Sequence, residues 1–576
     1  MKVVIVIINL LMLLPVSFAS QGGAEKMINA AIKASRTSCA SPCTVVFSAE
    51  STTAQGLDSH GIWSQLSYYW DFGTGIHSPK GYLYKQQYSY VDGDTSFESG
   101  HVPMVTKTFL CDVGTCTYRV AMRAQNELGH FDDTSVDITV NSESVQWRVK
   151  DTICVSNTLK TNIDWSAYDK PCPAGAKQQK KLPRADKYND KLILLRKGDV
   201  FKQNVATYAD QSNFKVGFFG NTNDARPQID GNVSVGMTSI TRPTHAPSAA
   251  SYSKLSNRIL KRFGWPSNIP SNIYFEGLHL ASFSFPMSYR QIGIHNIDMD
   301  RSHYSFGGYI NVSSGADICH YSKVDCRLIP FPKGGYISSV NVVGSNPSAV
   351  NVNIVQTECA MVNFLGMTDV NVRRAREHNV RIAGWYRINI MRSRFQGVHE
   401  GPGKHKITLR SCLDSGGTWE RGVWASTPFK ASNWNNDVEG KTRADSESTD
   451  PQSMEFLHTS RYQVVAHNQL GDDMYAGESQ GGVFYSTSVA SGDAALQQDI
   501  IVAHNYFEEE RGRVSKNGFI SLISNYGTCV GNIYPNNVRY QYDCVPVSQP
   551  PEHVFRNEPK PIPLPLSPAL KATLGF

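Results

Sequence analysis

The sequence has little of what marks several common functional classes. Its 12 cysteines include no Cys-x-x-Cys pair, and its 16 histidines include no His-x-x-x-His spacing, so the usual zinc-binding patterns are missing. The formal net charge is only +6, and neither a Lys/Arg-rich tail nor a nucleic-acid-binding motif accompanies it. No hydrophobic run long enough to span a membrane follows the N-terminus. These absences argue against a zinc enzyme, a nucleic-acid partner and a membrane span.

Residues 1–19 have the composition of an export signal. A basic start precedes the apolar run 3–14, and Ser17 and Ala19 supply small side chains for cleavage after Ala19. Twelve cysteines also fit an oxidising compartment. We therefore expect a secreted, periplasmic or cell-surface protein.

Most of the cysteines lie close to another cysteine in sequence, which suggests structural disulfides. Cys359 and Cys412 are left over. If the chain around them winds into stacked coils, as the strand pattern described below indicates, the two residues lie about two coils apart. Their Cα atoms would then be separated by roughly 10 Å, beyond disulfide reach. We predict that they do not pair with each other. The suggested pairs are Cys39–Cys43, Cys111–Cys116, Cys154–Cys172, Cys319–Cys326 and Cys529–Cys544.

Residues 24–141 show short alternating strands separated by turn residues, over 41–49, 67–73, 117–124 and 135–140. This pattern is typical of a β-sandwich. Trp70 lies in the middle of its strand and is expected in the core.

This segment resembles the PKD family of immunoglobulin-like modules. The resemblance is carried by Trp70-Asp71-Phe72-Gly73, by residues 114–118 (GTCTY), and by Asn126 with Gly129. It implies a spacer or a glycan-proximal binding module.

Residues 145–545 form a succession of short aliphatic strands, many led by Asn, with no long helical pattern. Asn371 to Asn389, Asn272 to Asn296, and Asn468 to Asn505 suggest coils of about twenty residues or more. Coils of this kind bury their apolar faces by stacking, and the repeated Asn side chains can form amide ladders along the stack.

The long segment resembles the right-handed parallel β-helix of the pectate-lyase-like superfamily. The predicted fold class is therefore all-β, with an N-terminal PKD-like β-sandwich followed by a long right-handed parallel β-helix. Residues 148–190 are expected to cover the first coil, because an open sheet edge needs protection. Residues 546–576 are rich in proline and are expected to form an extended tail or linker.

The stretch 371–412 is unusually cationic. Its strands alternate apolar and polar residues, and the polar positions carry only two acids, Glu377 and Glu400. We interpret it as a groove for an anionic polymer; a solvated charged face is the alternative. The charged positions expected to face outward are Arg376, Glu377, His378, Arg381, Arg387, Arg392, Arg394, His399, Glu400, Lys404, His405, Lys406 and Arg410.

Uronate polysaccharides can be cleaved by β-elimination, which needs a cation on the sugar carboxylate, a base and an acid. Arg381 and Arg410 are suited to bind carboxylates with two hydrogen bonds. Lys404 or His405 is the candidate base, and His378 or Arg410 the candidate acid. This assignment requires no cofactor, and Ca²⁺ is an open alternative as the neutralising cation. Further candidate substrate-binding residues are Arg376, Glu377, His399, Trp385 and Trp424.

The same stretch is similar to the active strands of polysaccharide lyases related to chondroitinase B and alginate lyases. Glu377 with Arg381, then Lys404, then Leu409-Arg410 occupy the corresponding order. The spacing differs, because Lys404 precedes Arg410 by six residues instead of a full strand and turn. The resemblance implies a secreted monomeric lyase acting on an anionic polysaccharide.

Two alternatives stay open. A glycoside hydrolase on the same fold would need paired carboxylates, for which Asp472 and Asp473 are candidates. The Asn-Thr-Asp, Gly-His-Gly and Arg-Ile-Lys motifs of polygalacturonases are absent. A non-catalytic surface or adhesin protein that binds glycans would also fit a sandwich followed by a β-helix.

Overall fold

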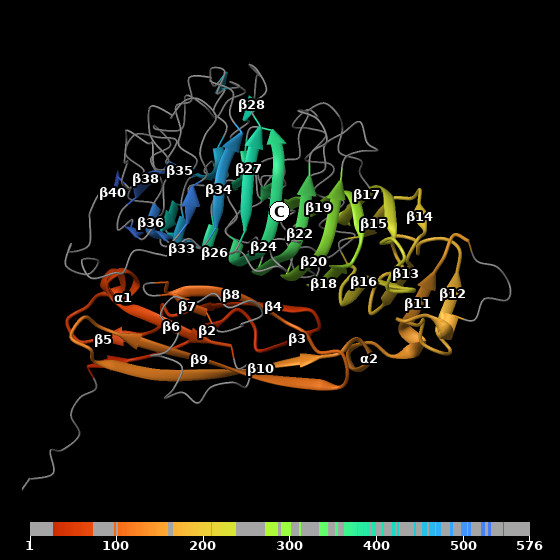
Figure 1. Cartoon of the computed structure of the whole chain (residues 1–576), viewed down its shortest axis with the longest axis horizontal. Helices are drawn as coiled ribbons and strands as arrows, with labels where there is room; N and C mark the ends of the chain where they lie inside the picture. The colour runs from red at the N-terminus through yellow and green to blue at the C-terminus, as the bar shows by residue number, and fades with distance from the viewer. Residues whose placement is uncertain are drawn as a thin grey trace, which may run out of the picture.

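The protein is almost entirely β in the residues that its structure, a computed structural model, describes (Figure 1). This confirms the all-β prediction. No helix within these ranges is long and apolar enough to cross a membrane. The described residues are 27–72, 97–99, 102–158, 165–208, 210–237, 271–285, 290–300, 310–312, 333–343, 352–354, 362–376, 378–383, 385–391, 393–398, 406–407, 418–420, 423–425, 443–444, 452–457, 460–466, 468–473, 484–487, 497–503, 505–507, 520–524, 528–530 and 545–546.

The N-terminal region is a sandwich of two sheets around an aromatic core. Phe47 packs against Trp70, Phe72 and Phe109 with ring centres 6.2 Å apart, and Trp70 is fully buried as expected. One sheet has the order β3 (Ser38–Ala40), β10 (Phe131–Asn141), β9 (Thr115–Gln125), β6 (Ser67–Asp71) and β7 (Phe97–Ser99). The other has the order β2 (Lys33–Ala34), β4 (Cys43–Ser48) and β8 (Met104–Phe109), and β1 (Ile28–Asn29) pairs with β5 (Thr53–Ala54).

The sandwich also contains a short helix that the strand pattern did not predict, α1 (Ser59–Gln65). The carboxylate of Asp58 caps it by accepting hydrogen bonds from the backbone N–H groups of His60 and Gly61, at 3.1 and 2.8 Å. A second helix, α2 (Glu143–Gln146), follows β10 and leads into the parallel region.

Three of the predicted disulfides are present. They join Cys39 to Cys43, Cys111 to Cys116 and Cys154 to Cys172, with Cα–Cα distances of 5.7, 5.8 and 6.2 Å. The remaining predicted pairings, and the prediction for Cys359 and Cys412, involve residues outside the described ranges.

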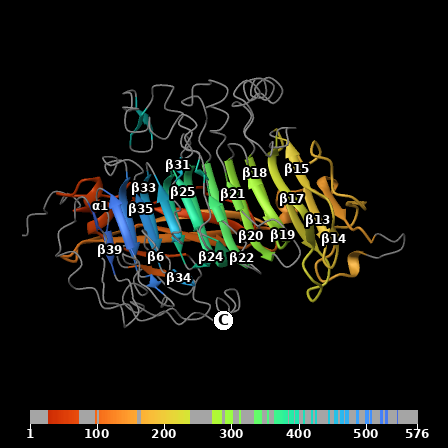
Figure 2. The same ribbon diagram turned by 90° about the horizontal axis from the view of Figure 1, so that it is seen from above.

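From β11 onward the chain winds as a parallel β-helix, in which each strand pairs with the equivalent strand of the next coil (Figure 2). The first ladder runs through β11 (Thr152–Val155), β13 (Leu192–Arg196), β16 (Phe214–Phe219), β18 (Ser271–Glu276), β20 (Arg290–Asp300), β22 (Lys333–Val343), β24 (Val362–Arg376), β26 (Trp385–Met391), β33 (Ser460–Ala466), β36 (Gln497–Ala503) and β39 (Thr528–Val530), with β12 (Lys177–Gln179) on the far edge of β11. The second ladder runs through β14 (Val200–Phe201), β17 (Gln228–Met237), β19 (His279–Phe285), the ends of β20, β22 and β24, then β27 (Arg394–Val398), β34 (Gln469–Asp473) and β37 (Tyr506–Phe507).

The third ladder is a separate six-stranded parallel sheet. Its strands are β23 (Val352–Ile354), β25 (His378–Ala383), β32 (Gln452–Leu457), β35 (Phe484–Thr487), β38 (Ile520–Ser524) and β40 (Val545–Pro546). The other strands are β15 (Val205–Tyr208), β21 (Ile310–Val312) and the pairs β28 (Lys406–Ile407) with β31 (Arg443–Ala444) and β29 (Thr418–Glu420) with β30 (Val423–Ala425).

The predicted asparagine ladder is present over the later coils. The Asn468 side chain accepts a hydrogen bond from Ser393 N at 3.0 Å, and the Asn505 side chain accepts one from Asn468 N at 2.9 Å. These residues occupy equivalent positions, as expected for Asn468 and Asn505. The other two expected equivalences are wrong. Asn371 pairs in register with Arg394, not Asn389, and the neighbours of Asn272 pair with those of Gln291, not Asn296.

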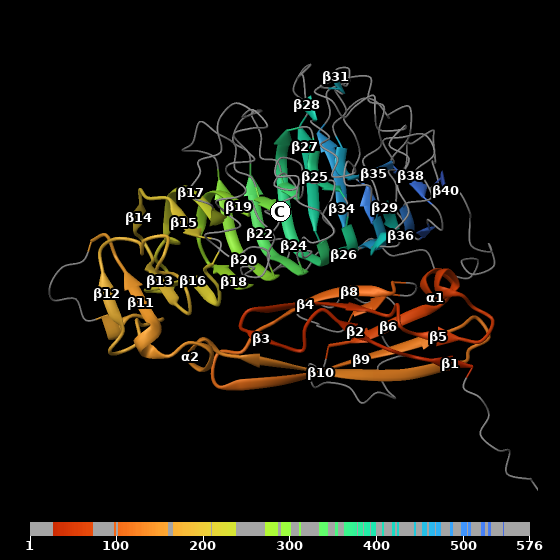
Figure 3. The ribbon, with the colours of Figure 1, turned by 180° about the vertical axis from the view of Figure 1, so that it is seen from behind.

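The sandwich lies lengthwise against the first ladder (Figures 1 and 3). Its sheet β2-β4-β8 faces strands β22, β24, β26 and β33. At Gly366 the two layers approach so closely that a Cβ atom would lie 2.7 Å from Val46 and 2.8 Å from Thr106. The spacer role implied by the resemblance is therefore wrong, because a spacer holds domains apart.

The sandwich covers the outer face of the first ladder, and this explains why the ladder's strands are apolar on both faces. The inner rows, such as Met367, Ile390, Val465 and Val502, fill the interior of the coils. The alternate residues are also buried, because Val464, Ala466, Ile501 and Ala503 belong to the same core as the sandwich. Strands buried on both faces lose polar alternation.

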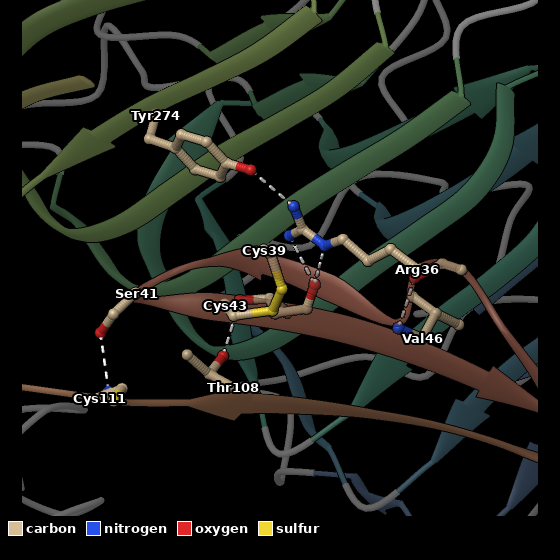
Figure 4. Close-up of a disulfide and its surroundings, with 10 residues drawn as sticks. Arg36, Cys39, Ser41, Cys43, Val46, Thr108, Cys111 and Tyr274 are labelled. Atoms are coloured by element: carbon tan, nitrogen blue, oxygen red, sulfur yellow. Dashed lines mark hydrogen bonds between the residues drawn. A yellow bond between two sulfur atoms is a disulfide. The ribbon is translucent and has the colours of Figure 1, made fainter. Parts of the chain in front are cut away.

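Charged and polar side chains join the two layers along their whole length. Arg36 of the sandwich donates hydrogen bonds to Thr44 O and, at 2.9 Å, to the Tyr274 hydroxyl (Figure 4). Asn389 donates to Met104 O at 2.9 Å. Near the far end His60 Nδ1 lies 2.5 Å from Asp499 Oδ1.

A column of left-handed residues lies beside these contacts. Phe364, Arg387, Tyr462 and Asp499 occupy equivalent positions in successive coils, with φ of 66°, 62°, 56° and 57°. Positive φ is uncommon for bulky residues and costs roughly 1–3 kcal/mol each. Their side chains contact one another and the sandwich. The Arg387 guanidinium lies 5.1 Å from the Phe364 ring centre, and the ring centres of Tyr462 and Trp63, a sandwich residue, are 4.8 Å apart. These contacts compensate the strain.

Candidate functional site

The third ladder aligns several charged and polar residues in one row, in which each residue pairs in register with the next across neighbouring strands. Arg381 of β25 is paired on one side with Asn353 and on the other with Glu455. Glu455 pairs in turn with Tyr485, and Tyr485 with Ser521. Neighbouring strands are about 4.8 Å apart, so this polar row crosses five coils within roughly 20 Å.

The rows on either side of it are mainly apolar. Val380 aligns with Val352 and Met454, and Ile382 aligns with Ile354 and Phe456. The alternation predicted for 378–382 is therefore repeated from coil to coil. A cation, a carboxylate and a phenol share one row, which is a suitable length for several sugar units of a polymer.

The structure describes the backbone at half of the residues predicted for the site. Arg376 ends β24, His378 and Arg381 lie in β25, and Trp385 begins β26. Trp424 lies in β30, opposite Trp419 in an antiparallel pair. The predicted residues outside the described ranges are Glu377, His399, Lys404, His405 and Arg410.

Two expectations for this stretch are wrong. Arg387 was expected on the outward groove face, but it is buried at the sandwich interface, where its Nε lies 2.5 Å from Glu50 Oε2. Strands 378–382 and 407–411 were expected side by side. The neighbours of residues 380–382 are β23 and β32, which leaves no free edge for another strand there.

The carboxylates considered for a hydrolase lie at the end of β34. Asp472 and Asp473 align with Gly397 and Val398 of β27, and Val398 aligns with Arg376. Register thus places Arg376 and Asp473 two strands apart, about 10 Å, on the second ladder. Within the described ranges no group of three or more His, Cys, Asp or Glu is arranged to hold a metal ion.

Sequence reasoning missed Glu455 and Tyr485 as members of the Arg381 row. The chain between β25 and β32 contains almost seventy residues, so no constant repeat length connects Arg381 to Glu455. The available signal was in β32, where Glu455 stands between the apolar residues Met454 and Phe456; in β35, Tyr485 stands between Phe484 and Ser486, so the alternation is weaker there.

No protein-family model and no curated protein matches the chain. Among solved structures, the chain is similar to the family 28 exopolygalacturonase of Yersinia enterocolitica, with 10% identity over 87% of this chain and 94% of that chain and a TM-score of 0.22. A TM-score this low carries no argument about function.

Proposed function

We propose that this protein is an extracytoplasmic polysaccharide lyase that cleaves an anionic, uronate-containing polysaccharide by β-elimination. The observation that supports it best is the polar row through Arg381, Glu455 and Tyr485 on a rigid parallel ladder. A rigid row holds binding groups at the spacing of the coils and requires little reorganisation when a polymer binds.

In this proposal Arg381 and Arg410 neutralise the carboxylate of the uronate. Lys404, His405 or Tyr485 removes the proton on C5, and the electron pair forms the C4–C5 double bond as the C4–O bond breaks. His378 or Arg410 gives a proton to the departing oxygen. Arg376, Glu377, His399, Trp385 and Trp424 contact neighbouring sugar units.

A glycoside hydrolase is the second candidate, favoured by the register of Asp473 with Val398 and Arg376. Hydrolysis would use Asp472 or Asp473 as the acid and a second carboxylate as the base or nucleophile. It would leave no double bond in the product.

The test is incubation of the whole chain with alginate, polygalacturonate and chondroitin sulfate. Ultraviolet absorbance from an unsaturated uronate supports a lyase. New reducing ends without that absorbance identify a hydrolase, and the absence of both leaves a binding protein.

Arg410→Ala provides the residue-level prediction. If Arg410 binds the uronate carboxylate, the substitution abolishes cleavage, and Arg410→Lys restores little because a point charge cannot replace the planar fork. The melting temperature is expected to stay within a few degrees if Arg410 serves only to bind substrate, since solvent-facing charges add little stability. Retained cleavage by Arg410→Ala, or unfolding, would assign the residue a structural role and direct attention to Asp472 and Asp473.

A further inference from the structure

A groove of about 780 Å³ is lined by residues of β11 and β12 and of the segments that flank them. These two strands lie at the N-terminal end of the β-helix, several coils away from β25, the strand of Arg381 (Figure 3). Its charge is strongly one-sided, with six lysines and one arginine against a single acid. The lining residues are Lys150, Ile153, Lys177, Gln179, Lys180, Lys181, Leu182, Pro183, Arg184, Asp186, Lys187, Asn189 and Lys191.

Only part of this charge is neutralised by the protein. Lys191 pairs with Asp151 at 2.9 Å, and Arg184 and Lys187 share Asp186 at 3.5 and 3.3 Å. The groove's other lysines form no ion pair with any residue in the described ranges. They are the exposed side chains Lys150, Lys177, Lys180 and Lys181.

The backbone that carries these lysines is held in place. Leu182 is nearly buried, and its N–H donates to the side chain of Gln203 at 3.0 Å. The N–H of Tyr188 donates to the side chain of Gln211 at 2.9 Å. The turn from β12 to β13 therefore presents its cations from a defined position, which lowers the entropic cost of binding.

Protection of a sheet edge explains only one of these residues. Lysine on an edge strand prevents pairing with other chains, and Lys177 lies on the edge strand β12. Lys180, Lys181, Arg184 and Lys187 lie beyond the strand, where there is no ladder to protect. An anion bound in the groove would relieve the mutual repulsion of these cations.

We propose that this groove is a second binding site that holds an acidic polysaccharide through several of its carboxylate or sulfate groups. Its thirteen lining residues include no aromatic side chain, which single-stranded nucleic acid would need for base stacking. The class of ligand assigned to this groove rests on the proposed function. In that function, the groove anchors the polymer at one end of the β-helix while another segment of the same polymer reaches the Arg381 row.

The test uses the full-length protein on immobilised polygalacturonate and chondroitin sulfate, with single-stranded DNA of similar charge as a third arm. Lys180→Gln/Lys181→Gln removes two groove cations. Arg119→Gln/Lys202→Gln removes two exposed cations outside the lining and gives the same net charge.

The groove variant is expected to bind a polysaccharide about tenfold more weakly than the wild type and to elute at lower salt, while the control variant keeps its affinity. Equally weakened binding in both variants would overturn the proposal that the groove binds polysaccharide. So would a wild-type protein that is retained on neither polysaccharide. Tighter binding to DNA would overturn the ligand class.

Failure of the groove and failure of the lyase proposal are distinguishable. If the protein cleaves a polysaccharide and the groove variant binds it as tightly as the wild type, only the groove proposal is rejected. Groove-dependent binding without cleavage of any polymer rejects the lyase alone and keeps the groove.

Discussion

Lys215 and Lys180 represent opposite environments for a lysine in this protein. Lys215, on β16, is 1% exposed and donates to Ser41 O at 2.9 Å. It also forms ion pairs with Glu143, at 2.7 Å, and Glu276. Lys180, in the groove, is exposed and forms no ion pair within the part of the chain that the structure describes. The two side chains are chemically the same, yet one joins sandwich, α2 and β-helix, and the other faces solvent.

The comparison shows how to separate structural from binding charges in a cationic protein. Where the chain provides carboxylates and carbonyls around a buried cation, the charge holds the fold together. Where it provides none, the charge is available to a ligand. Arg387 belongs to the first group, although sequence placed it with the second.

Lys215→Met is expected to have the largest effect on stability. It would leave Glu143 and Glu276 close together and partly buried without their shared cation, at a cost of about 3–5 kcal/mol. Urea unfolding with the wild type as reference measures this. A loss below about 1 kcal/mol would show that Lys215 is not a structural charge.

Arg387→Met is expected to cost less, about 2–3 kcal/mol, because Glu50 keeps its contact with Lys33 at 2.8 Å. The substituted side chain can still pack near Phe364 and Tyr462. The same urea titration tests it, with Glu50→Gln in the Arg387→Met background as the matched control. If that second change does not recover stability, the Glu50 carboxylate left without Arg387 is not the cause.

Acid should weaken the cluster of Lys215, Glu143 and Glu276. Burial would raise the pKa of Glu143, but Lys215 and Lys170 lower it to about 2. A depressed carboxyl pKa stabilises the folded state above the ordinary value near 4.5 and loses this contribution as pH falls toward 2. Melting temperatures over this range should fall more steeply for the wild type than for Glu143→Gln. Parallel curves would contradict the assignment.

Arg119→Gln is expected to have the smallest effect. Arg119 forms an exposed pair with Asp137 at 2.9 Å, and exposed pairs contribute little. Calorimetry should give an unchanged melting temperature. A clear decrease would mean that pairing in an exposed position is structural here, and the distinction between the two groups of charges would fail.

Local sequence patterns predicted a stack of coils and one of three expected residue equivalences, but not the sandwich that covers the stack. Alternation identified the strand at 378–382, and the Asn-led repeat identified Asn468 and Asn505 as equivalent. The sandwich interface joins residues as distant as His60 and Asp499, and no local pattern encodes such a pair. The uninterrupted apolar run 500–503 was the available signal, since a half-exposed strand would alternate.

The column of left-handed residues and the neighbours of Arg381 in its row were both not predicted, for different reasons. Phe364 and Tyr462 are poor residues for positive φ, so local preference points away from the conformation that tertiary contacts impose. Arg381 was among the residues predicted for the site, but its register neighbours Glu455 and Tyr485 follow long insertions. Coil register across an insertion depends on which strands stack, and length alone does not specify it.

The position of the sandwich has a consequence for how the chain folds. A polypeptide emerges from the ribosome N-terminus first, so residues 27–141 are complete before β16 to β36 exist. The sandwich face then provides a template on which each new coil settles, closing contacts across as many as 439 residues. In refolding from denaturant all coils collapse together, and contacts this distant form slowly. We expect refolding in vitro to be slower and more prone to aggregation than folding during synthesis.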